Sequence, residues 1–494
     1  MNPLTVQLFA GTLGVLALPF ALAGCGGSGT TSDMGHVPAP IHTLAYVVSE
    51  CRDVPPPPGH TVGPFFERYA LVVRDGEHAP VTVAEIPELG PVQPPVSLGC
   101  RYWGHVLFGG HYSMERGGFT KLGVSPDGST VVFEETDELS AVFPHDFLPP
   151  EQKGIFSVRA DGKGLRRLGP PAREPTWAPI LVGQFFFNIT FSPDGRTIAF
   201  PDIGPGPTGD SPQIFTMDLA SGTRKQITQL PLILPTEGAF GLPAVFGPIF
   251  LDNETIAFFT SETTLSVAAT VKVDGSDLKV PAPPVPTPGV IVPRFQITGD
   301  RLAVFQSYLL DHGHASGPTP FFTSSFPLEL FAFDGSNLLQ LTTFGRADTG
   351  LLGALVGPDE DHVFFTASAD PFGTNPSENC QIFSIDRLGR DLRQLTDFHT
   401  AEHSVIGCTS YPSTQGCAPF LQAQDAISGT LVFSSGCGTN PSSSQIFSVR
   451  PDGSGLRQLT NLRGTFTDAE GAFHAELPGP WAYGPYVPGG TSLP

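Results

Sequence analysis

Residues 154–168 read GIFSVRADGKGLRRL and residues 445–459 read QIFSVRPDGSGLRQL, so that 11 of 15 positions are identical although the two stretches lie 291 residues apart. Similar stretches begin at Gln213, Glu329 and Gln381, and a more divergent one, TVKVDGSDLKV, begins at Thr270. The mean spacing is about 58 residues, which is typical of proteins built from repeated small sheets. The repeat therefore indicates the architecture of most of the chain.

Each copy predicts a β-hairpin, because alternating apolar residues lead into an Asp-Gly turn and a second short strand. A second signature lies upstream of several copies, as VSPDGSTVVF from 124 and FSPDGRTIAF from 191, with weaker forms from 251, 298, 357 and 427. In Pro-Asp-Gly, proline fixes φ, aspartate caps the turn and glycine permits a positive φ. Two hairpins per repeat predict a four-stranded sheet.

Four-stranded sheets that recur in this way bury their faces by stacking around an axis. We therefore expect an all-β β-propeller of four-stranded blades over residues 41–486, with seven blades, or six as the alternative. The first blade is expected to include Leu44–Glu50 and Tyr69–Val83. Residues 472–486 are expected to pair with that blade and close the ring, because closure removes exposed strand edges. Residues 487–494 would form a C-terminal tail.

The two repeated phrases resemble the PD-type repeats of the TolB-like propeller superfamily over residues 120–460. That superfamily also supplies the propellers of some serine peptidases and of oligogalacturonate lyase. The resemblance implies a non-catalytic scaffold that binds a protein or a polymer of the cell envelope. The alternative that it implies is a metal-assisted polysaccharide lyase-like enzyme.

Composition restricts the partners. The chain has 47 Asp and Glu against 26 Lys and Arg, a net charge of −21, which disfavours nucleic acid as a partner and favours basic partners or cations. The 57 Gly and 52 Pro argue against a helical bundle, and 40% hydrophobic residues argue against disorder. We expect a monomer without a cofactor.

Residues 1–24 contain no charged side chain and end in Leu22-Ala23-Gly24 before Cys25. This segment resembles a bacterial lipoprotein signal peptide, which implies that Cys25 becomes the lipidated first residue. Residues 25–40 would then be the flexible tether, as their Gly- and Ser-rich start suggests. The resemblance implies a lipid-anchored protein of the bacterial cell envelope, at the outer membrane rather than the inner one and either periplasmic or surface-exposed.

Six cysteines remain after Cys25, an even number that suits disulfides in an oxidising compartment. They are Cys51, Cys100, Cys380, Cys408, Cys417 and Cys437. Six thiols allow 15 pairings, so the connectivity stays open. Cys408 and Cys417 bracket a short segment and could close it, which would leave Cys51 with Cys100 and Cys380 with Cys437. Zinc binding is the poorer interpretation, because no CxxC spacing occurs.

The long connections between strands are expected on one face of the ring, at 134–153, 201–212, 306–328, 367–380, 397–425 and 434–444, and binding sites usually lie on such connections. Candidate ligand-face residues there are His312, His314, Asn375, His399, His403 and Asn440. Asn375 and Asn440 belong to a repeated Gly-Thr-Asn-Pro-Ser, for which a turn is the simpler interpretation. The histidines could share a metal, but no carboxylate spacing completes a site. Without GxSxG or HExxH, no catalytic residue and no metal site are assigned.

Overall fold

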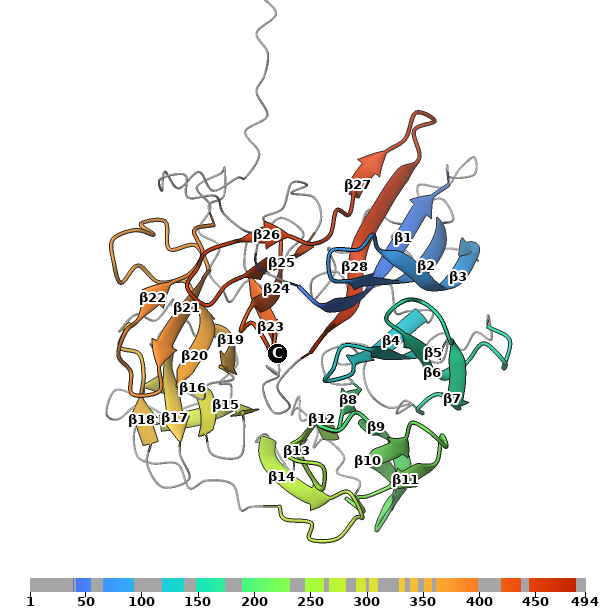
Figure 1. The fold of residues 1–494 in the computed structure, drawn as a ribbon, viewed down its shortest axis with the longest axis horizontal. Helices are drawn as coiled ribbons and strands as arrows, with labels where there is room; N and C mark the ends of the chain where they lie inside the picture. The colour runs from blue at the N-terminus through green and yellow to red at the C-terminus, as the bar shows by residue number, and fades with distance from the viewer. Residues whose placement is uncertain are drawn as a thin grey trace, which may run out of the picture.

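The computed structural model is an all-β β-propeller, in which small sheets stand side by side around a common centre (Figure 1). The all-β β-propeller that the sequence predicts is confirmed. The structure describes residues 39, 41–54, 65–92, 118–136, 148–173, 189–231, 245–261, 266–280, 290–298, 302–309, 328–333, 338–344, 351–357, 361–398, 419–436 and 444–485. Within these ranges, no helix is long and apolar enough to span a bilayer.

The strands of these ranges form seven antiparallel sheets. One sheet, here the closing sheet, has the order β27 (Gly464–Thr467), β28 (Phe473–Gly484), β1 (Thr43–Asp53), β2 (Phe65–Asp75), β3 (Val81–Val92). The next two consist of β4 (Gly118–Val124), β5 (Thr130–Thr136), β6 (Gly154–Arg159), β7 (Arg166–Gly169), and of β8 (Thr190–Phe191), β9 (Thr197–Gly206), β10 (Gly209–Asp218), β11 (Arg224–Gln226). A three-stranded sheet follows, with β12 (Val245–Phe250), β13 (Thr255–Ser261), β14 (Ser266–Lys272).

The remaining sheets have four strands each. They are β15 (Val290–Thr298), β16 (Leu302–Leu309), β17 (Leu328–Phe333), β18 (Leu338–Gln340); β19 (Leu351–Val356), β20 (His362–Ala367), β21 (Gln381–Asp386), β22 (Arg393–Gln394); and β23 (Phe420–Gln424), β24 (Leu431–Ser435), β25 (Gln445–Val449), β26 (Arg457–Gln458). The expectation of four strands per sheet therefore holds for five of the seven. In the three-stranded sheet, the fourth position is reduced to an isolated bridge between Thr270 and Lys279.

One expected long connection is absent. Residues 201–212 were expected to be irregular, but β9 and β10 continue through them and pair as far as Gly206 and Gly209. Gly209 has φ 126°, a conformation that favours glycine, and a two-residue link then suffices to reverse the chain.

The Pro-Asp-Gly turns form as predicted. In the turn between β4 and β5, the Asp127 carboxylate accepts hydrogen bonds from the Ser129 amide (2.9 Å) and the Ser125 hydroxyl, and Gly128 has φ 73°. These bonds outweigh burial and hold the pKa of Asp127 below its usual value. The polar groups of the turn are thus satisfied within the turn itself.

A glutamine and a threonine recur in several copies of the repeat because they form a buried contact, which we call the Gln–Thr clamp. In the β19–β22 sheet, the Gln381 amide donates to the Phe398 carbonyl (2.7 Å) and accepts from the Thr396 hydroxyl (2.8 Å) and the Phe398 amide (2.9 Å). Gln213 and Gln445 make the same three kinds of bond in their own sheets. The clamp fastens the outermost strand to its neighbour.

Replacing Gln381 by Leu is expected to lower the free energy of unfolding by about 1–3 kcal/mol, because the buried amide and carbonyl of Phe398 lose their partners. Urea denaturation followed by fluorescence measures this change. Thr374→Val is the control, since this exposed side chain makes only a 3.3 Å contact to Gln394. Equal stability of the two variants would contradict the clamp.

The core lies between neighbouring sheets. Each apolar cluster draws residues from two adjacent sheets, as where Val47 and Tyr69 of the closing sheet meet Phe133 of β5. Phenylalanines of the two repeat signatures stack across strands, with ring centroids of Phe133 and Phe156 5.4 Å apart. Stacked rings therefore take the positions that the alternating apolar pattern marks.

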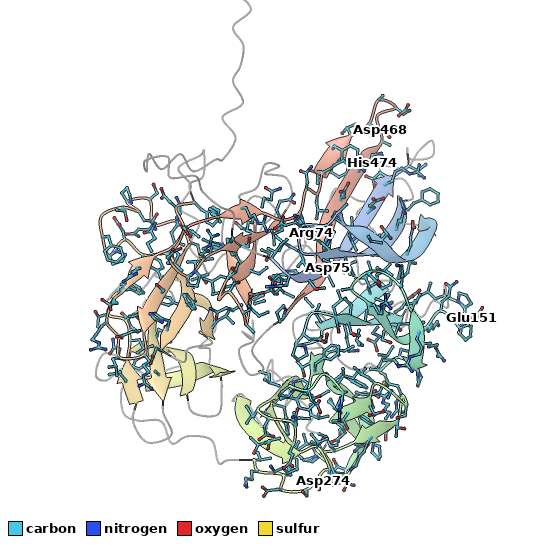
Figure 2. The ribbon with its side chains drawn as sticks, viewed as in Figure 1. Arg74, Asp75, Glu151, Asp274, Asp468 and His474 are labelled. Carbon is cyan, nitrogen blue, oxygen red and sulfur yellow. The ribbon has the colours of Figure 1, made fainter. Side chains whose placement is uncertain are left out.

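The C-terminal strand closes the ring as predicted, because β28 pairs antiparallel with β1 from Thr43–Gly484 to Arg52–His474. The junction is sealed by polar contacts: Asp425, fully buried between β23 and β24, accepts from the Tyr483 hydroxyl (3.0 Å) and contacts Nδ1 of His42. Arg74, labelled in Figure 2, donates to the Leu459 carbonyl across the same junction (2.8 Å). The first and last described strands are thus joined to each other and to the β23–β26 sheet.

Candidate functional site

The two faces of the ring differ. Because neighbouring strands run antiparallel, the turns β4–β5, β6–β7 and their equivalents lie on one face, here the turn face. The opposite strand ends, from which the chain continues from β5 to β6 and from β7 to β8, and their equivalents lie on the other face, here the connection face. His312, His314, His399, His403 and Asn440 lie outside the described residues, as do Cys25, Cys100, Cys408, Cys417 and Cys437.

Asn375 is not available to a ligand, which corrects the expectation for this residue. It is fully buried, and its amide donates to the Ala369 carbonyl (2.9 Å) and the Asn379 carbonyl (2.8 Å) and accepts from the Asn379 amide (3.1 Å). All three bonds stay within its own connection. The turn interpretation of Gly-Thr-Asn-Pro-Ser therefore holds at this position.

Cys51 and Cys380 are both disulfide-bonded and both buried. Cys51 lies in β1, and Cys380 immediately precedes β21. They belong to sheets that are separated by the β23–β26 sheet.

The end of β5 on the connection face carries two consecutive acids, which point to opposite sides of the strand. Glu134 is fully buried beside Lys121, whose Nζ lies 2.5 Å from Oε2 of Glu134. Its other carboxylate oxygen accepts from the Ala172 amide (2.5 Å). This acid is therefore neutralised by a cation within its own sheet.

Glu135 is different. Its side chain is only 9% exposed, and its carboxylate has no hydrogen-bond or ion-pair partner among the described residues. Burial raises its pKa from 4.5 to about 7. At neutral pH this carboxyl group is thus divided between its protonated and charged forms.

The surroundings of Glu135 are apolar and hold a second acid. By strand alternation Glu135 shares its side of β5 with Phe133, which packs in one cluster with Tyr69 and Leu148. Glu67 of β2 lies on the closing sheet, and its side chain is only 2% exposed. Its carboxylate accepts a hydrogen bond from the Tyr69 hydroxyl (3.0 Å). Two buried carboxyl groups from adjacent sheets therefore face one apolar layer.

The next interface contains a buried ion pair. Asp202 of β9 contacts Arg224 and accepts from the amides of Arg173 and Ile203 (both 2.6 Å). The Arg224 guanidinium lies 4.7 Å from the Phe215 ring centre, and burial lowers its pKa to about 10. Like Glu134, Asp202 is neutralised locally, so Glu135 stands out on this face.

The arrangement suits proton uptake or the binding of a cation. Among the described residues, no three His, Cys, Asp or Glu side chains are grouped so that they could hold a metal ion. Sequence reasoning missed Glu134 and Glu135. The available signal was two consecutive acids directly after the buried Val-Val-Phe of β5, where the copy from 191 has Pro201-Asp202 and the copies from 251, 298, 357 and 427 have only neutral residues.

Replacing Glu135 by Gln is expected to remove a pH dependence of stability. The folded pKa lies above the unfolded one, so the wild type loses stability as pH rises from 4.5 to 7, by up to about 3 kcal/mol above pH 7. Urea unfolding at pH 5 and pH 8 tests this, with exposed Glu254→Gln as control. If the Gln variant keeps the full pH dependence, Glu135 is not its source.

No protein-family model matches the chain, and no curated protein matches it either. Several solved structures are similar in fold. The match to the β-propeller domain of the Trilobed protease from Pyrococcus furiosus covers 72% of this chain and 89% of that domain, with 9% identity and a TM-score of 0.40. The match to a putative TolB from Agrobacterium tumefaciens covers 88% of this chain and 99% of that protein, with 11% identity and a TM-score of 0.35. The match to an oligogalacturonate lyase from Vibrio parahaemolyticus covers 70% of this chain and 78% of that enzyme, with 10% identity and a TM-score of 0.40.

Proposed function

We propose that this chain is a lipid-anchored lipoprotein of the bacterial envelope whose TolB-like propeller is a non-catalytic scaffold for a protein or polymer. Cys25 carries the lipid, each of the seven sheets is one blade, and the mature protein is a monomer. The partner binds at the connection face.

The observation that carries this proposal is the Glu135 carboxyl group at the connection-face end of β5, which is buried and has no hydrogen-bond or ion-pair partner among the described residues. An acid held in an apolar layer costs folding free energy, and perturbed groups of this kind concentrate at functional sites. A basic group of a partner would recover that cost, in keeping with the net charge of −21. On the turn face, by contrast, the Asp127 carboxylate accepts hydrogen bonds within its own turn.

Trimming the connections tests the assignment. Residues 137–147, 310–327, 409–416 and 438–443 are replaced by short Gly-Ser links, which spares every cysteine. Binding to purified sacculi reports a polymer partner, and crosslinking to solubilised envelope proteins reports a protein partner. We expect an unchanged unfolding midpoint and loss of binding, and weaker binding by Glu135→Gln than by Glu254→Gln. Undiminished binding after all four replacements would rule the connection face out.

The lyase-like alternative makes a different prediction. A polysaccharide lyase that uses the histidines of residues 312–314 would carry a stoichiometric divalent metal. Elemental analysis of protein purified without chelator, compared with His312→Ala/His314→Ala, decides between the two. A stoichiometric metal that the double variant lacks would replace the scaffold proposal.

We also propose disulfides between Cys51 and Cys100, Cys380 and Cys437, and Cys408 and Cys417, as expected for an envelope protein. Their support is the bonded state of Cys51 and Cys380. Peptide mapping by mass spectrometry under non-reducing conditions is expected to recover these three linked pairs. Recovery of other pairs would refute the connectivity.

A further inference from the structure

The turn face carries almost all of the exposed large apolar side chains. Among the described residues there are eight, and seven lie at turns or adjoining strand ends of this face: Val81, Leu165, Leu278, Leu339, Leu388, Ile427 and Leu456. The eighth, Phe372, lies in the connection between β20 and β21 on the opposite face. Because the seven come from six different sheets, they are distributed around the ring (Figure 1). We call them the apolar ring.

The repeat explains this distribution. Leu165 and Leu456 occupy the same position of the repeat, directly after the Asp-Gly turn, and are 52% and 41% exposed. The neighbouring residue of the repeat is a cation that reaches the next sheet, as Arg166 does to the Ala220 carbonyl (3.0 Å). The cation thus has a role in joining sheets, whereas the leucine stays about half exposed among the described residues.

The chain enters the fold at this face. Ala39 is fully buried, and its amide donates to the Gly455 carbonyl (3.2 Å), next to Leu456. His42 then contacts Asp425, two residues before Ile427, which is 74% exposed. The tether that the sequence predicts after Cys25 would hold this entry point at a root-mean-square distance of roughly 20 Å from a lipid on that residue.

Charge favours the same orientation. About half of the 26 Lys and Arg lie at turns or strand ends of the turn face, and the described residues of this face carry acids and bases in similar number. Since the whole chain has a net charge of −21, the turn face is the one that anionic lipid headgroups repel least. Lys163 and Lys279 are 78% and 68% exposed, and their ion pairs with Asp161 (3.9 Å) and Asp277 (2.8 Å) are surface pairs of the kind that lipid headgroups compete with.

We propose that the turn face is a membrane-contact surface, on which the apolar ring inserts at the headgroup boundary of a phospholipid bilayer. This rests on the proposed lipid anchor, which supplies a high local concentration of the face at the membrane. Apolar side chains beside basic ones bind such an interface. The connection face then points away from the bilayer, toward its partner.

Two tryptophan reporters test the orientation in the lipidated mature chain. Leu456→Trp and Phe372→Trp replace side chains of similar exposure, 41% and 48%, on opposite faces. The protein is bound to vesicles of phosphatidylethanolamine and phosphatidylglycerol with brominated acyl chains, and the fluorescence above wild type is compared. We expect about twofold quenching for Leu456→Trp and none for Phe372→Trp. Equal quenching at both positions, or none at position 456, would overturn the proposal and leave the apolar ring as a surface for a protein.

A second measurement separates the apolar ring from the anchor. The mature chain with Cys25→Ser, exported without lipid, is sedimented with the same vesicles. We expect residual binding that falls about tenfold in Leu165→Ser/Leu388→Ser/Leu456→Ser and is unchanged in Phe372→Ser. Equal binding by these two variants would refute the membrane contact. Failure of the wild type to acquire lipid at Cys25, by contrast, would refute the anchor.

Discussion

Lys121→Met is expected to lower the free energy of unfolding by about 3–5 kcal/mol, among the largest effects of a single substitution in this chain. The substitution leaves the Glu134 carboxylate fully buried without the ammonium group that lies 2.5 Å away. The hydrogen bond from the Ala172 amide does not replace that ammonium charge. Urea denaturation monitored by tryptophan fluorescence measures the loss.

The double variant Lys121→Met/Glu134→Gln is the matched control. Glutamine keeps an acceptor for the Ala172 amide and removes the buried charge, so we expect the double variant to be more stable than Lys121→Met. If both variants lose the same free energy, the cost comes from packing around Lys121 and not from an unpaired charge.

Asp425→Ala is expected to lower the free energy of unfolding by about 3–5 kcal/mol, and to loosen the closure of the ring first. Its carboxylate is fully buried and accepts from the amides of Ile427 (3.0 Å) and Ser428 (2.6 Å) and the Tyr483 hydroxyl (3.0 Å). Burial and the Asp425 charge raise the pKa of Tyr483, so this hydroxyl remains a donor. Hydrogen exchange measured by mass spectrometry should show faster exchange in β28 and β1.

The protein contains its own control for this substitution. Asp468 pairs with Nε2 of His474 (2.8 Å), but on the β27–β28 hairpin that projects from the ring (Figure 2). Because water can replace that contact, Asp468→Ala is expected to leave the unfolding midpoint and exchange in β1 nearly unchanged. If Asp425→Ala behaves like Asp468→Ala, His42 and Tyr483 do not hold the closure.

Much of the fold could be predicted because its signals are local. The Pro-Asp-Gly turn needs only Asp127, its neighbours and a glycine with positive φ, and all lie within a few residues. Closure by the C-terminal strand was predictable because a ring leaves no other partner for that edge. The extension of β9 and β10 through residues 201–212 was not, because their pairing is settled across the hairpin and not by local propensity.

For the candidate site, the sequence predicted the face of the ring but not the residues. Asn375 was a plausible ligand residue until its amide was seen to bond within its own connection. Glu135 was overlooked, because an acid at a strand end is usually solvated and only the packing of the closing sheet against the β4–β7 sheet buries it.

The amino-acid sequence by itself determined the repeat, the hairpins, their turns and the stacking into a ring, since these follow from short-range chemistry that recurs along the chain. Tertiary structure alone decided which polar side chains are buried away from solvent. Glu134 and Glu135 are neighbours in sequence, yet one meets Lys121 and the other an apolar layer, because successive residues of a strand face opposite interfaces. The Asp425 junction likewise joins residues 383 and 58 positions apart, which no local pattern could specify.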